Sequence, residues 1–103
     1  MKRVVIAVKN NNYATRLSDY MYNWIIENRV AVDLIRSNGK EIKFQNGYNV
    51  DIVTKDQLHN YTLGRKDLTV LDCADQDYDV IHPFSIILDP LLEEIKTSKG
   101  VGY

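Results

Sequence analysis

The sequence predicts a single small α/β domain, and three patterns along the chain lead to this fold class. Two short apolar runs with β-branched residues, residues 4–8 and 68–72, are typical of buried strands in a parallel sheet. Residues 12–29 have helical periodicity, and residues 30–54 contain two Asn-Gly pairs. We therefore expect a buried parallel strand pair, a β-meander, an N-terminal amphipathic helix and a C-terminal helix at about residues 84–98.

Length and composition also fit one folded domain. The 103 residues suffice for a single modest core, so residues 1–103 are expected to fold as one unit. Hydrophobic residues make up 45% and charged residues 26%, which argues against a disordered chain. Thirteen basic and fourteen acidic residues leave a net charge of −1. No general electrostatic attraction to nucleic acid is therefore expected.

The single cysteine, Cys73, excludes an intramolecular disulfide and a zinc site of the Cys-x-x-Cys type. We expect it to act as a small hydrophobic side chain at the end of a strand, not as a catalytic thiol. The apolar run at residues 4–8 is too short for a signal peptide or a membrane span. A cytoplasmic protein without membrane contact is the expectation.

Residues 12–29 predict an amphipathic helix that follows a polar turn. Its apolar side chains recur in steps of three, four, three and one residues: Ala14, Leu17, Met21, Trp24 and Ile25. Trp24 is on this stripe and is expected in the core. Tyr20 and Tyr22 flank the stripe, and their rings suit an interface with another protein.

The meander at residues 30–54 is the clearest local prediction. Asn38-Gly39 and Asn46-Gly47 are strong hairpin signals, and they divide this segment into three strands. In the last strand, alternation puts Val50 and Ile52 on one face and Asn49 and Asp51 on the other. We expect a short helix or turn to follow at residues 55–64.

Two starts remain open for the C-terminal helix. Asp89-Pro90 is typical of an N-cap followed by a first-turn proline, which would begin the helix at Asp89. In the alternative, the helix begins near Pro83 and kinks at Pro90.

The segment at residues 67–79 carries the main candidate site. Asp72 ends the second apolar run, and three aspartates follow at every second position: Asp75, Asp77 and Asp79. Such carboxylates suit a divalent cation, and Mg²⁺ is the candidate ion for them. His82 would form an acid–base pair with Asp72. The alternative, an ordinary strand that ends in a solvated acidic loop, remains open.

Two basic residues, Arg65 and Lys66, are the candidates for contact with phosphate or nucleic acid. Tyr48 or Tyr61 would stack on a base, and Tyr48 is also a candidate for a protein interface. The alternative is scattered surface charge without a ligand, and the balanced net charge favours it.

Four segments occur in an order that is similar to a known family. Residues 4–14 (VVIAVKNNNYA), 42–52 (IKFQNGYNVDI), 63–67 (LGRKD) and 70–74 (VLDCA) resemble the central part of the ATPase domain of large terminase subunits, the viral DNA-packaging motors. More loosely, they resemble RecA-like helicase cores. The resemblance implies that residues 4–8 and 68–72 lie side by side in parallel, and that VLDCA matches the Walker B strand.

The chain departs from this family where ATP would react. It has no G-x-x-x-x-G-K-[ST] loop, whose amides and lysine surround the phosphates. The Walker B pair of acids is incomplete, because Leu71 and Cys73 flank Asp72. We therefore expect no ATP hydrolysis by this chain and no bound cofactor.

These observations predict a non-enzymatic protein-binding domain. It would be a phage or prophage product, located in the host cytoplasm, that resembles a truncated ATPase core. It would dock on a protein partner or self-associate through open sheet edges. The alternative is a small metal-dependent enzyme that acts on phosphate or nucleic acid through Asp72 and its neighbouring acids. A third hypothesis is that the chain complements a separate polypeptide that carries the nucleotide loop.

Overall fold

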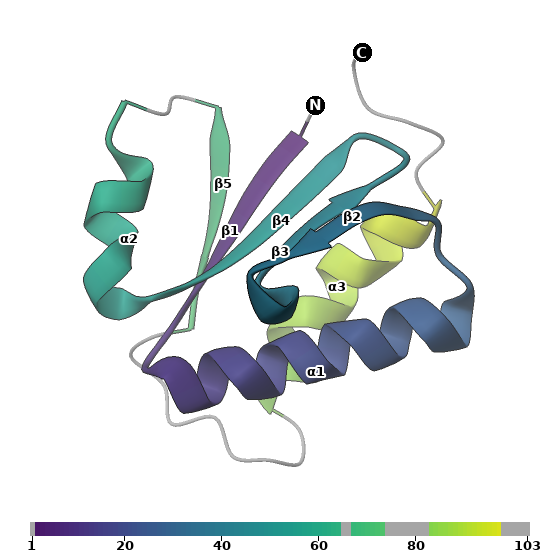
Figure 1. The fold of residues 1–103 in the computed structure, drawn as a ribbon, viewed down its shortest axis with the longest axis horizontal. Helices are drawn as coiled ribbons and strands as arrows, with labels where there is room; N and C mark the ends of the chain where they lie inside the picture. The colour runs from purple at the N-terminus through teal and green to yellow at the C-terminus, as the bar shows by residue number, and fades with distance from the viewer. Residues whose placement is uncertain (1, 65–66, 74–82, 98–103) are drawn as a thin grey trace.

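The computed structural model describes residues 2–64, 67–73 and 83–97, which form a five-stranded mixed sheet with helices on both faces (Figure 1). The strands are β1 (Lys2–Val8), β2 (Val32–Arg36), β3 (Glu41–Phe44), β4 (Tyr48–Thr54) and β5 (Leu68–Asp72). The helices are α1 (Asn11–Asn28), α2 (Lys55–Thr62) and α3 (Pro83–Thr97), and a 3₁₀ turn, η1 (Ser37–Gly39), follows β2. The strand order is β2-β3-β4-β1-β5.

The predicted fold class is confirmed. β1 is parallel to β5, with Val5 opposite Val70, and it is also parallel to β4, with Val5 opposite Asp51. β2, β3 and β4 form the predicted antiparallel meander. Both predicted terminal helices are present, within one or two residues of their expected limits.

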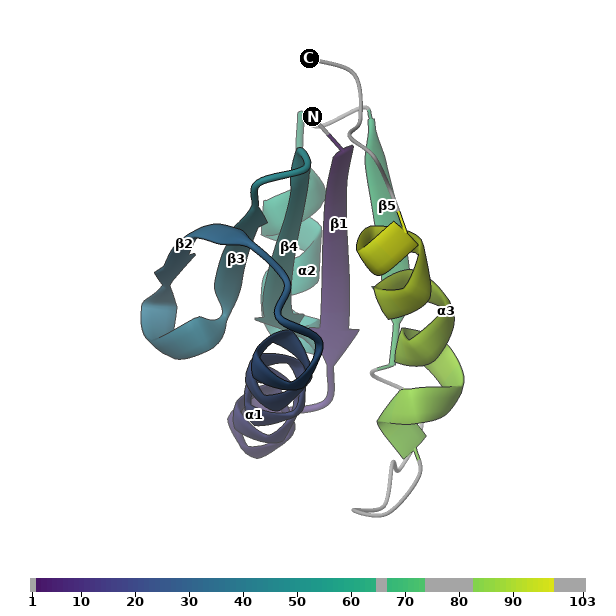
Figure 2. The same ribbon diagram turned by 90° about the vertical axis from the view of Figure 1, so that its right-hand side faces the viewer.

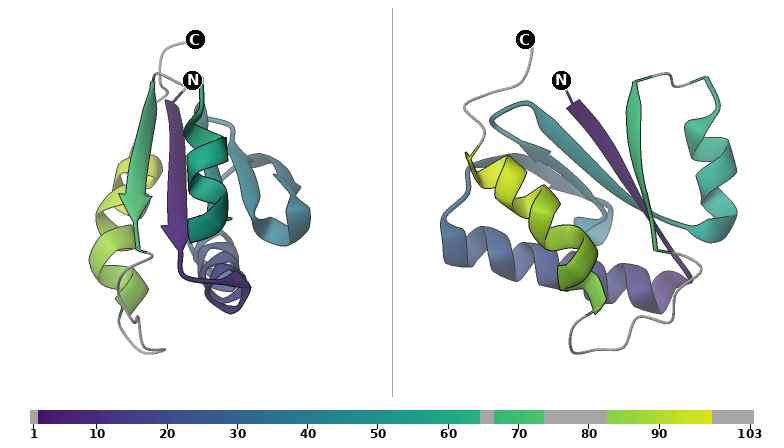
Figure 3. Two further views of the ribbon diagram at one scale, coloured as in Figure 1. Left: turned by 90° about the vertical axis from the view of Figure 1, so that its left-hand side faces the viewer. Right: turned by 180° about the vertical axis from the view of Figure 1, so that it is seen from behind.

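Two helical layers cover the sheet unequally. Figure 2 shows α1 and α3 on one face and α2 on the other, and the same arrangement is visible from the opposite side in Figure 3. The main core lies between the sheet and the pair α1 and α3, and Ile6, Leu17 and Leu92 are at its centre. The core under α2 is small and has three buried members, Val5, Ala7 and Val53.

The strand β5 differs from the expectation of a buried strand. β1 is buried on both faces from Val4 to Val8, whereas Thr69 and Val70 in β5 are exposed, Val70 by 42%. Among the described strands β5 lies at the edge of the sheet, so only one side of it is paired. An apolar run in a sequence does not distinguish an edge strand from a central one.

The first helix follows its predicted pattern. Asn10 caps it, because its Oδ1 accepts a hydrogen bond from the Tyr13 amide at 3.2 Å. Trp24 packs partly buried against the main core, as predicted. Ser18 is also buried, and a Cβ at Gly39 would collide with its Oγ. Gly39 therefore allows η1 to approach α1 closely, and its φ of 86° suits glycine.

The last helix begins at Pro83, so the second of the two predicted starts is the one found. Pro90 lies inside it, where a proline costs about 3 kcal/mol because it removes a hydrogen bond and its ring is crowded. Among the α3 side chains that the structure describes, four apolar ones are buried and offset this cost: Leu88, Leu91, Leu92 and Ile95.

The central position of β1 predicts the effect of a single methylene deletion. We expect Ile6→Val to lower the free energy of unfolding by about 0.5–1.5 kcal/mol, because the Ile6 side chain is fully buried. Urea unfolding followed by circular dichroism measures this change. Ile35→Val is the matched control, since Ile35 is 40% exposed, and it should change stability by less than about 0.5 kcal/mol. Equal losses would contradict the central position of β1.

Candidate functional site

The main sequence candidate, Asp72, lies exposed at the carboxyl end of β5. It pairs in register with Ala7 of β1, so it lies at the edge of the sheet where α1 and α2 begin. The candidates on either side of it lie outside the described residues: Asp75, Asp77, Asp79, His82, Arg65 and Lys66. Within residues 2–64, 67–73 and 83–97, no three His, Cys, Asp or Glu side chains are grouped to hold a metal ion. The magnesium site stays a prediction.

The neighbouring Cys73 is 2% exposed and belongs to the main core. Its amide donates a hydrogen bond to the Ala7 carbonyl at 2.8 Å, which extends the pairing of β5 with β1. This environment matches the predicted small hydrophobic role and not an accessible nucleophile.

The three candidate interface tyrosines lie in different environments. Tyr22 is 51% exposed on α1. Tyr20 is partly buried, and its hydroxyl donates to Asp89 Oδ1 at 2.8 Å, which links α1 to α3. Burial and this hydrogen bond raise the pKa of Tyr20 to about 12. Tyr48 is only 3% exposed, so its ring contributes to the core and offers no open surface.

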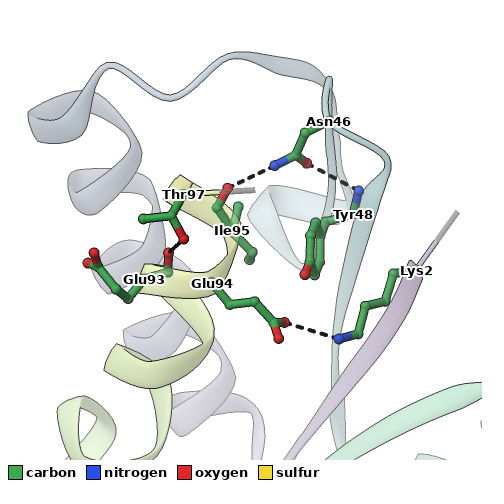
Figure 4. Close-up of polar contacts among 7 residues, drawn as sticks. All are labelled: Lys2, Asn46, Tyr48, Glu93, Glu94, Ile95 and Thr97. Atoms are coloured by element: carbon green, nitrogen blue, oxygen red, sulfur yellow. Dashed lines mark hydrogen bonds and ion pairs between the residues drawn. The ribbon is translucent and has the colours of Figure 1, made fainter. Parts of the chain in front are cut away.

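Tyr48 belongs to a contact between α3 and the first residues of β1 and β4 (Figure 4). Lys2 Nζ lies 3.1 Å from Glu94 Oε2 and 5.5 Å from the centre of the Tyr48 ring. Asn46 extends this contact, because its Nδ2 donates to the Ile95 carbonyl at 2.8 Å. Hydrogen bonds from Tyr48 and then Lys2 lower the pKa of the Glu94 carboxyl.

A second polar cluster lies on the opposite face of the sheet, where β4 meets α2. Asp51 is 7% exposed, and its Oδ2 accepts a hydrogen bond from the Tyr61 hydroxyl of α2. Asn49 Nδ2 lies 3.5 Å from the same oxygen, and an Arg3 guanidinium nitrogen lies 4.0 Å away. These donors compensate a buried negative charge, which would otherwise be costly.

This cluster was not recognised from the sequence. Alternation correctly placed Asn49 and Asp51 on the same face, but it does not indicate whether that face is covered. The cluster also explains how α2 is held. None of its own residues is fully buried, so the bond from Tyr61 to Asp51 and the packing of Leu58 and Tyr61 on Val5, Ala7 and Val53 attach it.

A pocket of about 410 Å³ lies between the ends of α1 and α3, beside the contact of Asn46 with Ile95. Arg29 and Lys96 are the charged residues that line it, and Asn46 spans it towards the Ile95 carbonyl. Among the described residues that line it, none is an acid or a nucleophile suited to catalysis.

No family model, no curated protein and no solved structure matches this chain. None of the helices in the described part of the chain has the length and apolarity needed to span a membrane.

The link between Tyr61 and Asp51 makes a stability prediction. We expect Tyr61→Phe to lower the free energy of unfolding by about 1–3 kcal/mol, because a buried carboxylate loses a hydrogen-bond donor. Chemical denaturation gives the value. Tyr22→Phe removes a hydroxyl from an exposed ring and should have little effect. If both variants behave alike, Asp51 does not depend on Tyr61.

The contact of Glu94 makes a pH prediction. Folding lowers the pKa of this carboxyl, so its contribution is present above the ordinary value of 4.5 and is lost as the pH falls through the lowered folded value. Because the side chain is 49% exposed, we expect Glu94→Gln to cost only about 0.2–1 kcal/mol at pH 7. This cost should disappear in acid.

The free energy of unfolding of wild type and of Glu94→Gln, measured between pH 2 and pH 7 in steps of about one pH unit, gives that dependence. Glu93→Gln removes the same charge from the adjacent exposed position of α3 and serves as the control. A difference between wild type and Glu94→Gln that persists unchanged at the acid end would refute the ionic origin of the contact.

Proposed function

We propose that the chain is a non-enzymatic protein-binding domain that self-associates through the open edge of β5. The observation that carries the proposal is that β5 is a regular strand at the edge of the sheet with an exposed apolar side chain. Among the described strands it pairs only with β1, its five residues are in register without a bulge, and Val70 is 42% exposed. A regular edge strand with an exposed apolar side chain is a template for pairing with another chain.

The other edge of the sheet is less suited to pairing. β2 is interrupted by a register shift between Val32 and Leu34, which leaves Asp33 as an extra residue. Asp33 and Arg36 are both exposed on this strand. Bulges and charges of this kind are the features that protect natural edge strands from pairing.

The thin layer around α2 also favours a partner on this side. Leu63, directly after α2, is 62% exposed, and Val70 lies on the face that α2 covers, because it pairs with Val5. A second copy of the chain that pairs with β5 about a two-fold axis would extend the sheet and cover this apolar surface.

We also propose that the domain is a phage or prophage product of the host cytoplasm that derives from, or mimics, the central part of a terminase-like ATPase core. The parallel neighbours β1 and β5 support this origin, because the resemblance implies that arrangement. The sheet would then be incomplete at β5, and a partner strand would take the place of the missing part.

The proposal predicts a dimer that depends on β5. We expect the wild-type chain to dimerise at high micromolar concentration and Val70→Lys to shift it to a monomer, because an exposed lysine opposes edge pairing. Light scattering after size-exclusion chromatography measures the mass. Ile35→Lys is the matched control on β2, where the side chain is 40% exposed, and it should leave the dimer intact.

A wild-type chain that is strictly monomeric would refute self-association through β5. Loss of the dimer in Ile35→Lys alone would move the interface to β2.

The position of Asp72 at the carboxyl edge of parallel strands favours one second candidate function, a metal-dependent enzyme acting on phosphate or nucleic acid. Under the protein-binding proposal, adding millimolar Mg²⁺ should not change the melting temperature of wild type or of Asp72→Asn. A Mg²⁺-dependent rise in wild type that is absent in Asp72→Asn, together with a nuclease or phosphatase signal, would support the enzyme instead.

A further inference from the structure

A pocket on α1 combines two aromatic rings with an acid. Its volume is about 220 Å³, and its described lining consists of Tyr20, Asn23, Trp24 and Glu27. Neighbours in this set are three or four residues apart, so successive turns of one helix bring their side chains together on one face. A cavity of about 150 Å³ holds a benzene molecule, so this pocket has room for a small planar group.

The pocket has an apolar inner wall and an open polar rim. Tyr20 and Trp24 are partly buried against the main core, and their rings form the wall. Glu27 and Asn23 are exposed residues, so their oxygen atoms are within reach of a ligand that enters from solvent.

Two carboxylates make this pocket negative. The Tyr20 hydroxyl donates to Asp89 Oδ1 at 2.8 Å, which puts the charge of Asp89 beside the ring. Burial, this hydrogen bond and then the charge of Glu27 raise the pKa of Tyr20 to about 12, so one hydroxyl is affected by both acids. Neither Glu27 nor Asp89 forms an ion pair with another described residue. Arg16, one turn before Tyr20, lies over the Tyr13 ring instead, at 5.5 Å.

An exposed apolar pair borders the pocket on the outer surface of α1. Tyr22 is 51% exposed and Ile26 is 56% exposed, and they are one helical turn apart. Ile26 is three residues after Asn23, so this pair lies directly beside the polar rim. A free small cation would leave the pair uncovered, whereas a polypeptide that fills the pocket with one side chain would cover it with the next.

We propose that this pocket binds the guanidinium group of an arginine side chain from a polypeptide partner. The planar group would stack on Trp24 and donate to the Glu27 carboxylate and to Asn23 Oδ1. A lysine ammonium group is compact and strongly hydrated, and it neither stacks nor forms a fork of donors. The partner residues beside the arginine would cover Tyr22 and Ile26.

The proposal does not rest on self-association through β5. The helix α1 covers one face of the sheet, whereas the exposed Val70 side chain lies on the face of α2 (Figure 2). A chain that is strictly monomeric would therefore still have the pocket.

The single tryptophan of the chain makes the test direct. Because Trp24 is the only one, its fluorescence and its indole N–H signal in NMR both report on the pocket. We expect N-acetylarginine methylamide to change both in a saturable way. The uncharged norleucine counterpart should change neither, and the lysine counterpart should bind at least about fivefold more weakly. Absence of a saturable change with the arginine compound, or equal affinity of the lysine compound, overturns the proposal.

Two capped tripeptides and methylguanidinium distinguish the sources of the group. Leu-Arg-Leu has apolar neighbours for the exposed pair, and Ser-Arg-Ser has the same charge without them. Tighter binding of Leu-Arg-Leu than of Ser-Arg-Ser and methylguanidinium supports a polypeptide partner. Equal binding of all three overturns the polypeptide source and leaves a free guanidinium compound as the ligand.

Variants locate the interaction. We expect Glu27→Gln to weaken binding of the capped arginine at least about fivefold, because a charged hydrogen-bond acceptor is lost. Asp56→Asn removes the same charge from an exposed position of α2 and should bind as wild type does. Wild-type affinity in Glu27→Gln, or equal weakening in Asp56→Asn, overturns the assignment.

Ile26→Ser tests the apolar pair separately. We expect it to weaken Leu-Arg-Leu and to leave the affinity for the capped arginine unchanged, because only the tripeptide covers this side chain. Unchanged binding of Leu-Arg-Leu would exclude the pair from the interface. Glu27 and Ile26 are both exposed, so the two variants are expected to fold.

Discussion

The pairing of β1 with strands on both sides is the constraint on which the rest of this structure depends. Residues 4–8 are almost completely excluded from solvent, so each side of β1 needs a strand and each face of it needs a helical layer. The meander supplies β4 on one side, and the connection through α2 supplies β5 on the other. The helices α1 and α3 then cover one face with a continuous apolar core.

The opposite face is completed differently, and the proposed self-association follows from this difference. Only the short helix α2 lies there among the described helices, and a polar cluster around Asp51 takes the place of a broad apolar core. Val70 remains exposed on β5, on the same thinly covered side of the sheet, and this exposed apolar side chain suits contact with another molecule.

The sequence by itself determined the features that depend on neighbouring residues. The two Asn-Gly pairs predicted the reversals of the meander because those residues favour tight turns locally. The apolar stripe of residues 12–29 predicted α1 and the core position of Trp24, since helical period alone defines a face. The apolar run at residues 4–8 predicted a buried strand. The parallel position of residues 68–72 beside it is not a local feature; it was implied by the resemblance of four segments to a known family, and the structure has this pairing.

Only the tertiary structure decided which of these faces and edges are covered. β5 is an edge strand and Tyr48 is buried because of where β1, β4 and α3 lie, and those neighbours are distant in sequence. Asn49 and Asp51 were expected on a polar face, yet both are buried, and α2 returns to the sheet there so that Tyr61 reaches Asp51. Burial is a property of non-local packing, so the period of a single strand does not contain it.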